Sequence, residues 1–198
     1  VNLPNWLWLS FRVEDGDWFD LGSAELLAHE IELDLFRGEL RRRLRFRDPA
    51  GRTTRVEQRR LVHLGEPHLA ALATTFLAED WSGRLTVRSG LDGHVTNGNV
   101  DRYRSLSSQH LEPVLEAEPD DETVLLEVVT TQSRVRVAQA ARTRVFGGEV
   151  RLDPPRGLHR EPGRIAHELE LGLDADVPCR VEKVVAVFTP RDQAITEP

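Results

Sequence analysis

The chain alternates apolar and polar residues over short segments that end in turn-forming residues. Over 84–88, Leu85 and Val87 stand between arginine and threonine side chains. The same period of two recurs in three other segments: 43–47, 134–137 and 167–171. Successive side chains of a β-strand point to opposite faces, so each segment predicts a strand with one apolar and one charged face. Sheets that bury one face favour antiparallel pairing, so the pattern predicts an antiparallel all-β fold.

Turn chemistry supports this prediction. Asp48-Pro49-Ala50-Gly51 lies between segments 40–47 and 53–64 and places proline and glycine where a tight reverse turn needs them. We therefore expect the two segments to form a hairpin around this turn.

Asp15-Gly16 lies between segments 7–13 and 18–21 and predicts a second short hairpin. Turn residues recur at the spacing of about 8–12 residues that is typical of β-sandwiches. We predict a single domain over residues 1–198, a large two-sheet antiparallel β-sandwich of the supersandwich type. It should contain at least about ten strands and less than about 15 % helix.

Other segments carry weaker signals. Residues 23–31 are compatible with one or two helical turns, but the alternation over 28–33 favours a strand. Residues 97–119 and 147–162 show no regular pattern and are predicted to be irregular. The first of these is long enough to be a functional loop rather than a simple connection.

The charged residues exclude one class of function. The 198-residue chain has a net charge of −7, and its 26 basic residues are 25 Arg and one Lys, Lys183. A general nucleic-acid binder needs a positive field, so no nucleic-acid partner is expected. The arginine excess fits cross-strand ion pairs, because the planar guanidinium meets a carboxylate in two places.

The cysteine content, the apolar runs and the N-terminal sequence indicate the cellular compartment of the protein. A single cysteine, Cys179, allows no intrachain disulfide, and no apolar run approaches the length of a membrane span. No signal peptide opens the sequence, so we expect a cytoplasmic protein without a membrane partner. The sequence contains no Met, so we do not expect Val1 to be the natural start of translation.

The sequence contains no motif that predicts a catalytic or metal site, and no cofactor is predicted. Cys179 follows Pro178 at the start of a strand, and we interpret it as buried and inert. His63 and His68 flank a short turn but lack a third ligand nearby, which argues against a metal site. The tryptophans either pack in the core, the interpretation we favour, or stack on sugar rings; they are Trp6, Trp8, Trp18 and Trp81.

The loop Asn97–Glu112 is the best candidate for a binding site. It brings together side chains that hydrogen-bond a polar ligand or a partner surface: Asn97, Arg102, Tyr103, Arg104 and His110. The alternative is a solvated loop whose arginines pair with neighbouring acids, and the residues alone do not decide between the two.

A series of short motifs follows one another along nearly the whole chain. They include Pro4-Asn5-Trp6-Leu7, Asp17-Trp18-Phe19-Asp20, 32–40 (ELDLFRGEL), Pro67-His68-Leu69, Trp81-Ser82-Gly83, 87–93 (VRSGLDG), Arg102-Tyr103-Arg104, His110-Leu111-Glu112-Pro113 and Thr130-Thr131-Gln132-Ser133. Each motif is weak, but their shared order is specific. Together they resemble the N-terminal domain of family 65 glycoside hydrolases, which include trehalose, maltose and kojibiose phosphorylases and related hydrolases.

The resemblance implies a β-sandwich that precedes a linker and an α/α-barrel. In such enzymes the barrel holds the general-acid Glu, and phosphate or water attacks the anomeric carbon with inversion. No catalytic residue can be carried over to this chain, and inorganic phosphate would be a co-substrate only if the parent is a phosphorylase. The family domain begins with a Gly-rich stretch and strands before the position of Val1, and segment 181–192 resembles its closing strand. We therefore expect a fragment that lacks both that start and the barrel.

Two main functions compete. The favoured one is an accessory domain that braces the catalytic barrel, shapes its substrate entrance and supplies contacts for a homodimer, with the α-glucoside bound by the parent enzyme. The rival is an independent carbohydrate-binding module, and a third reading is a purely structural sandwich. A binding module needs an exposed aromatic platform, whereas an accessory domain needs an apolar patch for docking.

Overall fold

The computed structural model describes residues 3–96 and 108–192, and these contain thirteen β-strands and no helix. The strands are β1 (Leu9–Val13), β2 (Glu25–Asp34), β3 (Glu39–Arg47), β4 (Thr53–Val62), β5 (Leu69–Ala78), β6 (Gly83–Asp92), β7 (Leu111–Asp120), β8 (Thr123–Thr130), β9 (Arg136–Gly147), β10 (Val150–Leu152), β11 (Arg156–Glu161), β12 (Arg164–Leu173) and β13 (Cys179–Phe188). The all-β prediction and the predicted number of strands are confirmed.

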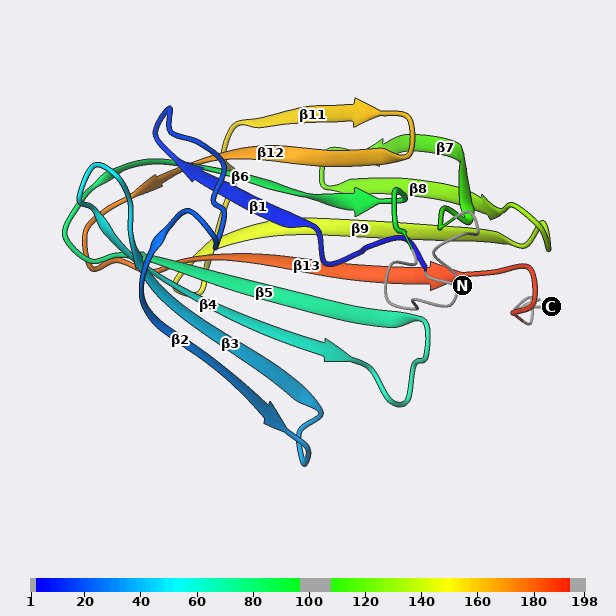
Figure 1. The fold of residues 1–198 in the computed structure, drawn as a ribbon, viewed down its shortest axis with the longest axis horizontal. Coiled ribbons are helices and arrows are strands. Elements are labelled where there is room, and N and C mark those ends of the chain that lie inside the picture. The colour runs from blue at the N-terminus through cyan, green and yellow to red at the C-terminus, as the bar shows by residue number, and fades with distance from the viewer. Residues whose placement is uncertain (1–2, 97–107, 193–198) are drawn as a thin grey trace.

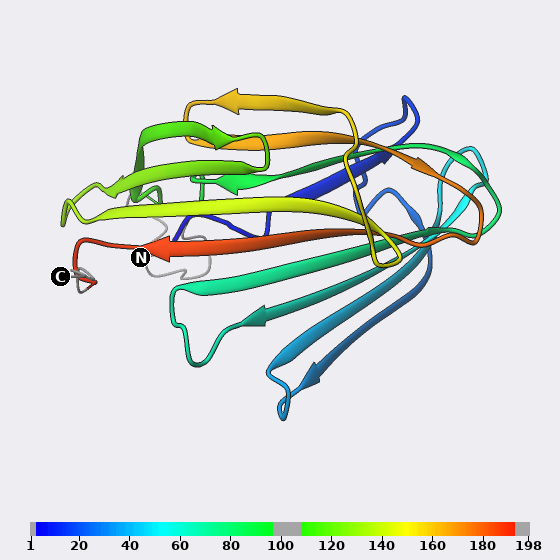
Figure 2. The same ribbon diagram turned by 180° about the vertical axis from the view of Figure 1, so that it is seen from behind.

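The strands form two antiparallel sheets that pack face to face. The smaller sheet has four strands in the order β1-β6-β12-β11, and the larger has nine, with the path β2-β3-β4-β5-β13-β9-β8-β7 and β10 paired with β9. Figures 1 and 2 show that the smaller sheet lies over only part of the larger one, while β2, β3 and β4 fan out beyond it. The predicted sandwich is confirmed, and its two layers are unequal.

The β3–β4 hairpin forms as predicted. Arg47 pairs with Thr53 across the turn, and the Asp48 carboxylate accepts hydrogen bonds from the backbone N–H groups of Ala50 (2.9 Å) and Arg52 (3.0 Å). Gly51 has φ +86°, a left-handed conformation that favours glycine. The strand predicted over 28–33 is also confirmed, as part of β2.

The hairpin predicted around Asp15-Gly16 is wrong. A turn is present, but β1 pairs with β6, and segment 18–21 forms no strand. Phe19 donates one backbone hydrogen bond to Phe11 O (2.7 Å), and its ring packs against Phe11 (centroids 4.7 Å apart) and Phe46 (4.5 Å). The Phe19 side chain is half-buried against the core, and this single backbone bond to β1 does not make a strand.

The two segments predicted to be irregular are partly strands. β7 occupies the end of the first segment, and β10 and β11 lie within the second. β7 and β11 are edge strands with largely exposed side chains on both faces, which removes the alternation that burial imposes. Pro113 and Pro119 are accommodated in β7 because an edge strand has backbone N–H groups that need no ladder partner.

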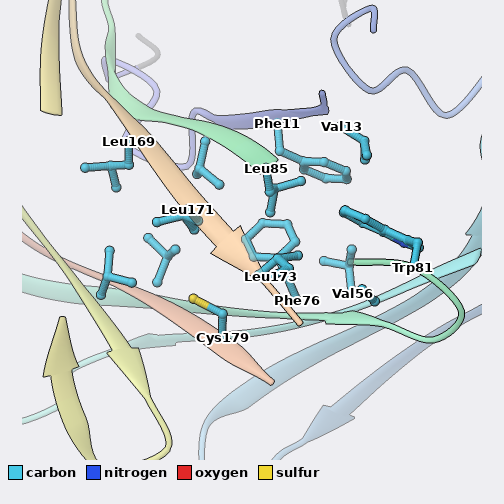
Figure 3. Packing of buried hydrophobic residues seen from close by; sticks show 14 of the residues in the cluster. Phe11, Val13, Val56, Phe76, Trp81, Leu85, Leu169, Leu171, Leu173 and Cys179 are labelled. Carbon is cyan, nitrogen blue, oxygen red and sulfur yellow. The ribbon is translucent and has the colours of Figure 1, made fainter. Parts of the chain in front are cut away.

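The main apolar cluster lies where the two sheets overlap. Leu169, Leu171 and Leu173 of β12 face Phe76 and Cys179 of the larger sheet (Figure 3). Cys179 is buried as predicted, and burial raises the pKa of its thiol. A second cluster fills the other half of the sandwich around Leu91, Leu126, Ile165 and Val185.

Candidate functional site

The predicted loop is only partly described by the structure. Asn97, Arg102, Tyr103 and Arg104 lie outside the described residues, so the loop remains a prediction. His110 is half-buried directly before β7, and its backbone carbonyl accepts a hydrogen bond from Thr131 N (3.0 Å). This contact fixes the backbone at one end of the loop.

The two histidines weighed as a metal pair have other partners. Nδ1 of His63 accepts the backbone N–H of Glu66 (2.8 Å), and Nδ1 of His68 lies 2.8 Å from Val187 O, with its ring stacked on Phe188. Within 3–96 and 108–192, no group of three or more His, Cys, Asp or Glu side chains is arranged to hold a metal ion. The same residues contain no helix long and apolar enough to span a membrane.

The chain's one lysine is buried between the sheets. Lys183 is fully buried, and its Nζ donates to the carbonyl oxygens of Trp6 (3.1 Å), Trp8 (2.6 Å) and Gly90 (2.9 Å). Three acceptors match the three N–H donors of an ammonium group. With no carboxylate among these partners, burial lowers the pKa of Lys183 to about 7. The burial of Lys183 was not predicted from the sequence; its side chain ties the segment before β1 and strand β6 to β13.

A second buried polar residue, His167, connects two residues that line an open acidic cleft of about 670 Å³. The buried His167 contacts Arg156 through Nδ1 (3.2 Å) and Glu118 through Nε2 (2.7 Å). Because a guanidinium can only donate, Nδ1 accepts from Arg156 and Nε2–H donates to Glu118. Burial is the main cause that lowers the pKa of His167. Glu122, on the cleft wall, is engaged by Arg144 (2.8 Å) and Arg151. Within the lining, Glu122 and Arg151 are thus ion-paired and Glu118 is bound by His167, and we assign the cleft no chemistry.

Of the four tryptophans, one is a core residue. Trp81 is buried and donates through Nε1 to Thr54 Oγ1 (3.1 Å). Trp6 is partly buried against the second apolar cluster. Trp8 and Trp18 are half-buried, and arginine guanidiniums lie over their rings: Arg164 5.7 Å from Trp8, and Arg12 and Arg88 5.0 and 4.3 Å from Trp18. These cation–π contacts occupy ring surface that a stacked sugar would need.

The outer face of the fanned strands is a network of ion pairs. Glu39 of β3 is buried and meets Arg41 and Arg59, and these two arginines lower its pKa to about 2. Arg45 and Arg55 share Glu79 (2.8 and 2.9 Å). The expected arginine–carboxylate pairing is confirmed on this face.

The inner face of the same strands differs. It carries Ile31, Leu33, Leu40, Arg42, Arg60 and Val62, and we call this set the uncovered face. Three of its members are well exposed: Ile31 (63 %), Leu33 (60 %) and Val62 (58 %). Within the described residues, Arg42 and Arg60 make no ion pair; the one polar side-chain contact of Arg42 is with His29 Nε2 (3.3 Å). The pKa of Arg60 is lowered, first by burial and then by the nearby positive charge of Arg42. Contiguous exposed apolar patches are typical of interaction surfaces, which makes the uncovered face a candidate for one.

Comparison with protein families gives one match over the entire chain. The family described as glycosyl hydrolase family 65, N-terminal domain, matches residues 1–198. A relative from Mycobacterium tuberculosis, named uncharacterized glycosyl hydrolase Rv2006, is 43 % identical over 98 % of this chain and 14 % of its own length. Kojibiose phosphorylase of Halothermothrix orenii is 25 % identical over 96 % of this chain and 23 % of its own length.

A solved structure has the same fold. A candidate kojibiose phosphorylase from the human microbiome superposes with a TM-score of 0.80 at 17 % identity, covering 100 % of this chain and 24 % of the other. The chain thus spans less than a quarter of the length of each of these proteins.

Proposed function

The chain belongs to the N-terminal domains of glycosyl hydrolase family 65, and we propose on that premise that it is the non-catalytic domain of a larger enzyme acting on α-linked glucose disaccharides. Supporting this proposal, relatives that match this chain over a fraction of their length are named kojibiose phosphorylase and α,α-trehalose phosphorylase. The single observation that carries it is the family match over residues 1–198.

In this proposal the reaction takes place in a catalytic barrel on the same polypeptide. A general acid there protonates the leaving sugar while inorganic phosphate or water attacks the anomeric carbon from the opposite face. Inversion requires the acid and the nucleophile to stand far enough apart to admit the attacking group. The domain described here braces that barrel, shapes its substrate entrance and contributes contacts to a homodimer in the cytoplasm.

We assign the entrance and assembly contacts to the loop Asn97–Glu112. Tyrosine and arginine are enriched where proteins bury contact surface, because they combine area with directional hydrogen bonds. In the full-length enzyme, Tyr103→Ala and Arg104→Ala should each lower activity or weaken assembly by about 1 kcal/mol or more. Unchanged kinetics and an unchanged oligomeric state in both variants would contradict this role.

The substrate class is tested by assaying the full-length protein with kojibiose, trehalose and maltose, with and without inorganic phosphate. The proposal predicts turnover of at least one of these sugars with inversion at the anomeric carbon. Phosphate dependence with release of a glucose phosphate would assign a phosphorylase, and phosphate-independent release of glucose a hydrolase. Failure to act on any α-linked diglucoside would reject the proposed substrate class.

A further inference from the structure

The uncovered face continues the interior of the sandwich. Leu33, Leu40, Arg60, Leu72 and Lys183 pair in register across β2, β3, β4, β5 and β13, so they form one row on the inner side of the larger sheet. The exposed fraction along this row is 0 % at Lys183, 2 % at Leu72 and 60 % at Leu33. The row changes from core to surface where the smaller sheet ends (Figure 1).

The two faces of the fanned strands differ in how their arginines are paired. Arg43, on the outer face of β3, lies within 3.7 Å of carboxylates from Glu30, Glu32 and Glu57. Arg42, next to it in sequence but on the inner face, has no carboxylate within ion-pair distance in the described part of the chain, and neither does Arg60. A surface that buried this face would need to supply both apolar side chains and negative charge.

We propose that the uncovered face is the docking surface for a segment of the same polypeptide that lies outside residues 1–198. This segment carries apolar side chains that pack on Ile31, Leu33 and Val62, and at least one carboxylate that pairs with Arg42 or Arg60. The inference rests on the proposed function, in which the chain is one domain of a longer protein. It adds where on this domain the rest of the protein binds, and through which chemistry.

Two observations favour this occupant over a second copy of the chain. In a two-fold symmetric contact the same surface appears on both sides, and the uncovered face holds no carboxylate, so it could not neutralise Arg42 and Arg60 of the other copy. The chain also spans only 14 % and 23 % of the length of the relatives compared above, which leaves ample polypeptide to supply the segment.

The proposal is tested by thiol labelling in the full-length protein encoded by the same reading frame. Leu33→Cys reports on the uncovered face, and Glu32→Cys is the matched control on the outer face of the same strand. The two positions are about equally exposed in this domain, since Leu33 is 60 % exposed and the Glu32 side chain 56 %. N-ethylmaleimide incorporation is followed by peptide mass spectrometry and normalised to the denatured protein, so buried cysteines elsewhere do not interfere.

Docking predicts that the Leu33→Cys thiol reacts at least about tenfold more slowly than the Glu32→Cys thiol, the protection expected for a contact that opens only rarely. Adding Arg60→Glu should raise the rate at Leu33→Cys, because it replaces an attraction by a repulsion, whereas Arg43→Glu on the outer face should not. Equal rates at the two positions would overturn the proposal. Protection that disappears when the protein is diluted to a monomer would assign the face to a second copy and would also overturn it.

The outcome is separable from that of the proposed function. A protein inactive on α-linked diglucosides that still protects the Leu33→Cys thiol would reject the substrate class and leave the docking surface standing. An active protein that leaves this thiol open would reject the docking surface alone.

Discussion

Replacing Lys183 by methionine should change how the stability of the domain depends on pH. The ammonium is fully buried and faces three carbonyl oxygens without a carboxylate among its partners. Burial lowers its pKa from 10.5 to about 7 in the folded state, whereas the unfolded chain keeps the ordinary value. Between these two pH values the unfolded chain therefore binds more protons than the folded one.

The sign and size of the effect follow from this difference. Where the unfolded state binds more protons, the free energy of unfolding rises with pH, at most by about 1.4 kcal/mol per pH unit for one group. Over the full shift, the folded state gains about 5 kcal/mol between about pH 7 and about pH 10.5, and below pH 7 this gain is absent. In Lys183→Met the contribution disappears at every pH.

The assay is equilibrium unfolding in denaturant at several pH values between about 7.5 and about 9.5, comparing the unchanged chain with Lys183→Met. The difference between the two free energies of unfolding should increase with pH in favour of the unchanged chain. Titration of Cys179 in the unfolded state affects both proteins equally and cancels in this difference. Parallel pH curves for the two proteins would refute the reasoning, because they would mean that the buried amine keeps its proton.

Four further substitutions, one of them a control, test the core and the ion-pair network. Phe76→Ala should lower the free energy of unfolding by about 3–5 kcal/mol because Phe76 is fully buried. The control Phe36→Ala, at a side chain that is 99 % exposed, should change it by less than about 0.5 kcal/mol. Similar losses for the two variants in denaturant unfolding would contradict the described packing. Trp81→Phe should cost about 1–3 kcal/mol, because it leaves the buried Thr54 hydroxyl without its donor, and an unchanged unfolding midpoint would argue against that bond. For Glu39, whose pKa is lowered to about 2, the stability advantage over Glu39→Gln should be present above about pH 4.5 and be lost as the pH falls towards 2; an advantage independent of pH in acid unfolding would contradict the pairing.

Alternation predicted those strands that have one buried and one solvated face. In β3 the core side chains Leu44 and Phe46 alternate with arginines, and in β12 Leu169, Leu171 and Leu173 alternate with Glu170 and Gly172, so the period of two is visible in the sequence. β7 and β11 lie at sheet edges with both faces largely exposed, so burial imposes no pattern on them. The Asp15-Gly16 turn is present, but β1 pairs with β6, and Phe19 packs its ring on Phe11 of β1, a tertiary contact that the turn residues do not encode.

The buried lysine left a signal that could have been used. Val181, Lys183 and Val185 alternate along β13, and the two valines mark the buried face, so the period of two places the lysine on that face. Sequence could not show that carbonyls from the segment before β1 and from β6 converge on it, because that depends on tertiary packing.

The uncovered face could be predicted only in part. The apolar positions of β2 are visible in the sequence, but their exposure depends on where the smaller sheet ends. The loop proposed as a contact site, Asn97–Glu112, was chosen by composition, and its test is the pair of substitutions proposed above.

The central proposal is that this chain is the non-catalytic N-terminal domain of a larger enzyme. The most direct measurement is the turnover of kojibiose, trehalose and maltose by the purified 198-residue chain, with and without inorganic phosphate, after circular dichroism has verified its β-rich fold. The account predicts no phosphorolysis and no hydrolysis of any of the three sugars. Turnover by the pure chain that is lost on substitution of a residue within it would contradict the account.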